Sequence, residues 1–214
     1  MAIARDASSF NSGTTWTTHT LSHTCSGTNR GLHVTLYLSS SSDLVTNVAY
    51  WWVAMSRLWS QNNGSSESQY SYYLKNPSSG ANNIVVTTSS SATVIMQNIS
   101  YTGTDQVTNP TVVTMSGFVS WITTLSTSVT TTVDNSWLSW AFRSGANQTA
   151  IAGTTLVTGV NATLQVGDSN WPKTPTGSYS LWVTFSSSFG AQIVIAIAPS
   201  VASTSSPAFF LNLL

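Results

Sequence analysis

Charge is the property that this sequence has least of. Lys, Arg, Asp and Glu make up only 6% of its 214 residues, whereas soluble domains typically carry roughly 25%. Six basic and six acidic side chains also cancel to a formal net charge of zero. Proteins that bind nucleic acid or anionic lipid surfaces usually present a basic patch. The composition therefore predicts no nucleic-acid partner and no membrane partner.

Cysteine and long apolar runs are also scarce. Cys25 is the single cysteine, so no internal disulfide can form. No stretch reaches the roughly 18 apolar residues of a membrane span, and residues 1–6 lack the basic and apolar regions of a signal peptide. Ser, Thr, Asn and Gly fill the polar positions, as in extracellular proteins, yet the sequence shows no export signal. Virion proteins combine these two features, because they assemble inside the cell and act outside it. We therefore expect assembly in the host cytoplasm and a place on the virion surface, with an extracellular surface as the alternative.

Helical periodicity is missing, and apolar residues instead recur every second position, as in β-strands. Residues 178–198 carry the strongest pattern, because strands at 179–185 and 191–198 flank a loop that contains Gly190. This pattern predicts a closing hairpin with Val183 and Ile195 buried. Further strands are expected at 14–24, 32–38, 45–50, 53–59, 70–74, 84–88, 92–101, 112–115, 125–131, 137–142, 154–156 and 161–166.

Many short strands separated by polar turns predict an all-β protein, an antiparallel β-sandwich of jelly-roll type. We expect one β-sandwich domain with a single core over residues 1–199. Residues 200–214 form a short Ser/Pro-rich C-terminal tail with an apolar end. This tail is too polar near Pro207 to continue the sandwich.

Four residues have the side chains of a zinc site, namely His19, His23, Cys25 and His33. On a strand the first three share one face, and His33 could approach from the next strand. Their spacing lacks the tight pairs of structural zinc sites, and cysteine is often a small buried hydrophobe. We therefore expect ordinary buried residues here, with no metal and no cofactor.

A catalytic constellation is not indicated either. The chain has no G-x-S-x-G elbow and no phosphate-binding glycine motif. Three of its six carboxylates stand beside Gly, Asn or Gln, where such side chains bond turn amides. The sequence therefore predicts a protein that is not an enzyme. The six carboxylates are Asp6, Asp43, Glu67, Asp105, Asp134 and Asp168.

Four short motifs resemble a widespread family of β-sandwich domains from tailed phages and bacterial surface proteins. They are residues 22–27 followed by Asn29-Arg30, residues 100–106, residues 129–137, and residues 167–170 leading into 177–181. The resemblance spans roughly residues 5–199. It implies a jelly-roll-like sandwich in a phage structural protein or a surface adhesin, and it carries no catalytic residues.

One departure from that family concerns a turn. Similar members often carry Asn-Gly between a Val-x-Tyr strand and a Val-Ala-Met strand, where this chain has Trp51-Trp52. Either the turn differs, or two indoles sit at a hairpin tip. Neighbouring strand residues face opposite sides, so at least one of these tryptophans is expected to be exposed. We therefore expect Trp51 and Trp52 to bind a partner, which is either another protein or a surface glycan.

The apolar end of the tail is the second expected contact. A free terminus with five large apolar side chains favours association, although the tail could also fold back onto its own domain. We expect it to dock onto another subunit or another virion protein. The residues concerned are Phe209, Phe210, Leu211, Leu213 and Leu214.

These observations lead to one functional expectation with an alternative. We expect a non-enzymatic virion structural protein of a tailed phage. Its specific role is expected to be that of a capsid decoration (cement) or head-fibre subunit, which contacts the major capsid protein and other copies of the chain. The alternative is a carbohydrate-binding or adhesive surface domain that uses its exposed aromatic side chains.

Overall fold

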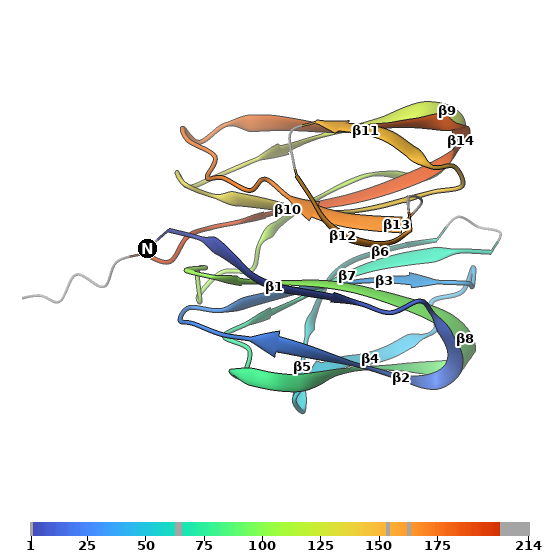
Figure 1. Ribbon diagram of the computed structural model, residues 1–214, viewed down its shortest axis with the longest axis horizontal. Coiled ribbons are helices and arrows are strands. Elements are labelled where there is room, and N and C mark those ends of the chain that lie inside the picture. Colours follow the sequence, from blue (N-terminus) through green and yellow to red (C-terminus); the bar gives the residue numbers. More distant parts are fainter. Residues whose placement is uncertain (1, 63–65, 153–154, 162–163, 202–214) are drawn as a thin grey trace, which may run out of the picture.

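The computed structural model describes residues 2–62, 66–152, 155–161 and 164–201, which form two antiparallel sheets without any helix (Figure 1). The all-β sandwich predicted from the sequence is confirmed, and the jelly-roll connectivity stays a prediction. The strands of the first sheet are β1 (Ala4–Phe10), β2 (Thr14–Cys25), β3 (Gly31–Leu38), β4 (Val45–Tyr50), β5 (Val53–Ala54), β6 (Ser56–Asn62), β7 (Ser68–Lys75) and β8 (Gly80–Thr102). Those of the second are β9 (Thr111–Thr130), β10 (Trp137–Ser144), β11 (Gln148–Ala152), β12 (Thr155–Asn161), β13 (Leu164–Asp168) and β14 (Ser178–Ile197).

The two sheets repeat one arrangement of strands. The first runs β4-β8-β3-β7-β6 after the short edge strand β5, and the second runs β11-β14-β10-β13-β12. In both, the long strand also pairs outside this order, namely β8 with β1 and β2, and β14 with β9. Asn29 and Asn135 precede the equivalent strands β3 and β10, with φ angles of 50° and 63°. The chain therefore consists of two topologically equivalent halves.

Each half folds around its own apolar cluster, and a third cluster lies between the halves. The single core expected from the sequence is therefore not what the described residues form, whereas one domain over residues 1–199 stays a prediction. Val34 and Met96 belong to the first cluster, Phe142 and Val183 to the second, and Ile195 to the third. In Figure 1 the second half, drawn in yellow-green to red, stacks on the first.

The predicted closing hairpin is wrong, because β14 runs without reversal from Ser178 to Ile197. Pairing with β9 shifts register between Thr184 and Ser188, and such bulges bend a strand without ending it. Gly190 serves packing here, since a Cβ would lie 2.8 Å from the side chains of Leu125 and Phe185. The burial expected of Val183 and Ile195 is confirmed.

Other strand boundaries predicted from the sequence also differ from those of the structure. The strands expected at 84–88 and 92–101 are one strand, β8, and those expected at 112–115 and 125–131 are one strand, β9. The strand expected at 53–59 divides into β5 and β6, which pair with different neighbours. The serine-rich stretches at 89–91 and 186–188 lie at register shifts of the pairing, so they form bulges that do not end the strand.

Polar contacts also join the two halves. His33 on β3 lies with Nδ1 2.8 Å from Ser139 Oγ on β10 and with Nε2 2.9 Å from Ser71 Oγ. Arg5 donates two hydrogen bonds, of 2.7 and 2.6 Å, to the buried carboxylate of Asp168. Paired buried charges need such geometry to offset their desolvation. The halves are therefore held in one relative orientation by both apolar and polar contacts.

Candidate functional site

The hairpin between β4 and β5 ends in the two-residue turn Trp51-Trp52. Tyr50 pairs with Val53 across the turn, and the φ angles of Trp51 and Trp52 are 56° and 87°. Positive φ at both central residues defines a type I′ turn, which usually carries Asn-Gly. Of the two alternatives that the sequence left open, the structure has the indoles at a hairpin tip.

This backbone conformation is unfavourable for tryptophan. A left-handed conformation costs a side-chain-bearing residue about 1–2 kcal/mol, and such strain is most often kept at ligand sites. The Trp51 amide donates a 3.1 Å hydrogen bond to Asn83 O. The hydroxyl of buried Tyr50 lies 3.2 Å from His23 O and 3.1 Å from Gly80 O. These hydrogen bonds of Trp51 and Tyr50 therefore attach the strained turn to β8 and β2.

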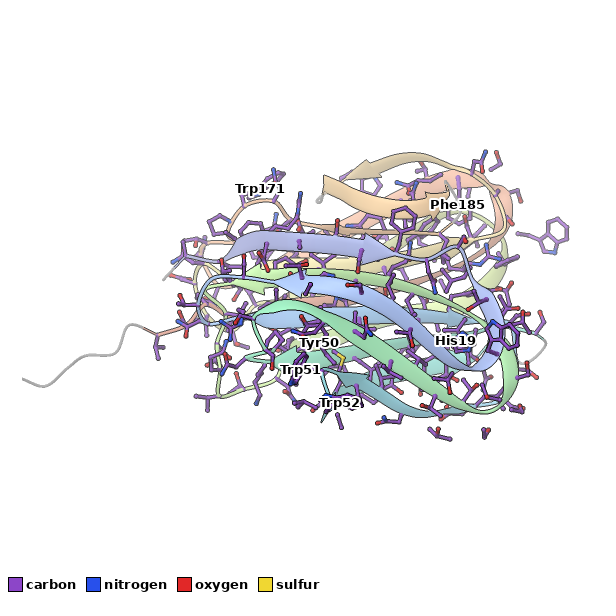
Figure 2. The ribbon with its side chains drawn as sticks, turned by 60° about the horizontal axis from the view of Figure 1, so that its bottom comes forward. His19, Tyr50, Trp51, Trp52, Trp171 and Phe185 are labelled. Carbon is purple, nitrogen blue, oxygen red and sulfur yellow. The ribbon has the colours of Figure 1, made fainter. Side chains whose placement is uncertain are left out.

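Both indoles are accessible to solvent. Trp51 is 53% exposed and Trp52 is 90% exposed. Figure 2 shows them side by side at the edge of the first sheet, close to Tyr50 and far from Trp171 and Phe185. The expectation that at least one of these tryptophans would be exposed is confirmed.

A groove of about 280 Å³ lies between this turn and β8. Its remaining lining residues are neighbours in β8 and combine small, amide and apolar side chains. Ala81 and Asn83 are exposed, Asn82 is buried, and Val85 is half-buried. We call Trp51, Trp52 and these four residues the aromatic groove.

The surface beside the aromatic groove carries hydroxyl groups. On β2, Ser22 pairs with Asn83, and Thr20 pairs with Val85. Both β2 side chains are exposed, so they extend the same face of the sheet. Residues 44–56 and 76–104 contain no Asp, Glu, Lys or Arg. The aromatic groove therefore presents π faces, amides and hydroxyls without any formal charge from these segments.

Further exposed tryptophans lie elsewhere in the fold, and the sequence analysis did not single them out. Trp16 lies at the bend of β2 and Trp121, with a φ angle of 59°, at that of β9. The ring of Trp171 is covered on one side by Lys173, whose Nζ lies 4.7 Å from the ring centroid. Trp51 and Trp52, like Trp16 and Trp121, have no such ring or cation contact with another described residue, but only the turn places two adjacent indoles beside a groove. Their π faces are therefore available to a ligand.

The candidate zinc ligands do not converge. His19 Nδ1 lies 3.1 Å from Thr14 Oγ1, and His23 Nδ1 lies 2.8 Å from Ser9 Oγ. Burial lowers the pKa of His23 to about 4 and that of His33 to about 3, so both are neutral at pH 7. Cys25 packs in the first apolar cluster. Among the described residues, no group of three or more His, Cys, Asp or Glu side chains could hold a metal ion.

The carboxylates are engaged within the fold. Asp105 and Asp168 accept hydrogen bonds from the backbone amides of Val107 and Asn170, two residues further on, which confirms their predicted turn role. Asp134 instead accepts from the amide of Thr176 in a distant loop. The other three contact Ser26, Arg57 and Arg143. The acidic groups therefore bond turns and basic side chains of the fold.

Comparison of the chain with protein-family models, with curated proteins and with solved structures gives no match in any of the three. The resemblance to phage and surface β-sandwich domains therefore stays a prediction. The described part of the chain contains no helix that is long and apolar enough to cross a membrane. The second predicted contact, formed by Phe209, Phe210, Leu211, Leu213 and Leu214, lies outside the described residues.

Proposed function

We propose that this protein is a non-enzymatic structural component of a tailed-phage virion surface, as a capsid decoration or head-fibre subunit. The observation that carries the binding role is the aromatic turn. Two adjacent tryptophans occupy left-handed backbone positions and remain largely exposed, although an Asn-Gly pair would build the same turn with less strain. Strain that contributes nothing to folding is best explained by contact with a partner.

Three further features support the virion assignment. The motifs quoted above resemble phage structural domains, and the strand-rich fold agrees with that resemblance. The surface is rich in Ser and Thr and poor in charge, so specific assembly must rely on apolar and hydrogen-bonding contacts. We propose the major capsid protein and further copies of the chain as partners, with residues 203–214 as a candidate arm.

Quantitative mass spectrometry of purified particles tests the virion assignment. We expect the chain at a fixed ratio to the major capsid protein, retained after gradient purification and washing in high salt. Salt should have little effect, because few charges are present to be screened. A chain that is missing from particles, or that salt washing removes, would refute the assignment.

Deletion of residues 203–214 tests the arm separately. We expect the shortened chain to remain folded and to sediment as a smaller species, with weaker binding to particles that lack the protein. The domain should be unaffected, because β14 already ends at Ile197. Unchanged sedimentation together with unchanged particle binding would rule the arm out.

The second candidate function is a carbohydrate-binding or adhesive surface domain. The exposed indoles beside Asn82 and Asn83 favour it, because aromatic faces and amides together suit sugar rings. It differs from the first proposal in its location and in its partner, which is a glycan and not a capsid protein. A chain found on a cell surface and missing from particles would favour this candidate.

A further inference from the structure

We infer that the aromatic groove binds a neutral saccharide. This inference rests on the proposed binding role of the Trp51-Trp52 turn, but it does not depend on whether the protein is carried by a virion. It assigns a ligand class to residues of β8 that lie far from the turn in sequence and that the motifs did not indicate.

Stacking is the first part of the argument. A pyranose ring presents a face of C–H groups, and an indole offers a flat apolar surface with negative potential above it. The faces of Trp51 and Trp52 are free of ring and cation partners among the described residues. With 53% and 90% of their surfaces exposed, these side chains can accept a ring without any rearrangement of the core.

Hydrogen bonding is the second part. Sugar hydroxyls both donate and accept, and the side-chain amide of Asn matches them with an NH₂ group and a carbonyl oxygen. Asn83 is exposed beside the turn. Asn82 alternates with Asn83 and is buried on the opposite face of β8, where its Nδ2 donates within the fold to Tyr50 Oη, Ser79 O and Gly80 O. Asn83 is therefore the amide that faces a bound sugar.

The missing charge defines the class of sugar. The turn, β8 and the neighbouring β4 and β5 contribute no Lys, Arg, Asp or Glu. Sialylated, sulfated or phosphorylated glycans carry anionic groups that are usually bound by basic side chains. Without such side chains the groove would have to desolvate an anion and give no compensation. Neutral hexose-containing glycans are therefore the ligands that it fits.

The size and rigidity of the aromatic groove suit a small ligand. The volume of about 280 Å³ is near the lower end, about 300 Å³, of ordinary small-ligand sites. The turn is anchored by the bond from Trp51 N to Asn83 O, so less conformational freedom is lost on binding. One or two sugar units are expected to occupy the groove.

The experiment uses the full chain and a panel of immobilised glycans. Oligosaccharides ending in glucose, galactose or mannose are compared with their sialylated and sulfated forms. Binding is then titrated by nuclear magnetic resonance through the indole N–H signals of Trp51 and Trp52, which are assigned with single variants. We expect at least one neutral glycan to bind and to shift these two signals.

Variants test the site itself. Trp51→Ala and Trp52→Ala should each weaken neutral-glycan binding about tenfold or more, as expected for a central aromatic contact. Asn83→Asp keeps the shape but removes the amide donor, and it should also weaken binding. Trp16→Ala is the matched control, because Trp16 is 66% exposed at the bend of β2 and away from the groove. It should leave binding unchanged, and thermal unfolding verifies that every variant is folded.

Two results would overturn the inference. The first is a panel in which no neutral glycan binds, or in which binding requires the anionic group. The second is neutral-glycan binding that survives both tryptophan variants. If the same variants abolish attachment to particles and no glycan binds, then the groove contacts a protein, which refutes this inference and leaves the proposed virion function intact.

Discussion

Replacing Trp52 by glycine and by alanine measures the backbone strain in the turn. At most positions alanine gives the more stable protein by about 0.4–1 kcal/mol, because glycine leaves the unfolded chain more freedom. Trp52 has a φ angle of 87°, where a Cβ costs about 1–2 kcal/mol and glycine is unstrained. The order should therefore invert, with Trp52→Gly more stable than Trp52→Ala by about 1 kcal/mol.

Loss of the indole does not obscure this comparison. Trp52 is 90% exposed, so only about 25 Å² of a side chain of up to about 250 Å² is buried, worth about 0.6 kcal/mol. Both variants lose that contribution equally. For a chain of this size, a difference of 1 kcal/mol corresponds to about 2–4 °C in the midpoint of thermal unfolding.

Differential scanning calorimetry of the two variants, supported by urea unfolding, is the assay. The same pair of substitutions at Trp16, whose φ angle is negative and whose side chain is exposed, is the control, and there alanine should be the more stable. If Trp52→Ala equals or exceeds Trp52→Gly in stability, then the turn is not strained and the argument that a ligand explains it fails.

Three further predictions concern the contacts that hold the fold together. The folded-state pKa of His33 is about 3, below its unfolded value of about 6.5, so its stabilising contribution is complete above pH 6.5 and falls as the pH is lowered toward 3. Urea unfolding should show a loss of stability between pH 7 and pH 4.5 that is smaller by about 2–3 kcal/mol in His33→Gln, because His23, whose pKa is also lowered, still contributes in both proteins, and equal losses in both proteins would refute this. Ile195→Ala should destabilise by about 2–5 kcal/mol, because Ile195 is fully buried in the cluster between the halves, and an unchanged thermal midpoint would contradict that placement. Arg5→Ala should cost about 3 kcal/mol in urea unfolding, since it leaves the fully buried carboxylate of Asp168 without its cation, whereas a loss below about 1 kcal/mol would give this pair only the value of an exposed one.

Part of the candidate site followed from the sequence. Two adjacent tryptophans between two strand patterns cannot both enter one core, because neighbouring strand residues face opposite sides. The prediction of an exposed indole is confirmed, although both indoles are exposed because they form the turn and not because strand residues alternate. Asn82 and Asn83 gave no such signal, because the pairing of β4 with β8 brings them to the turn from another part of the chain.

The sequence by itself determined the class of fold and the face of many residues, because alternation is a local property of the chain. Leu32, Val34, Leu36 and Leu38 alternate, and all four pack in one cluster. The tertiary structure alone decided that β8 and β14 continue through their serine-rich segments, that the apolar residues divide into three clusters, and that the aromatic groove exists. The physical reason is that alternation encodes which side a residue faces, whereas the partner strand decides whether a polar stretch bends, bulges or turns.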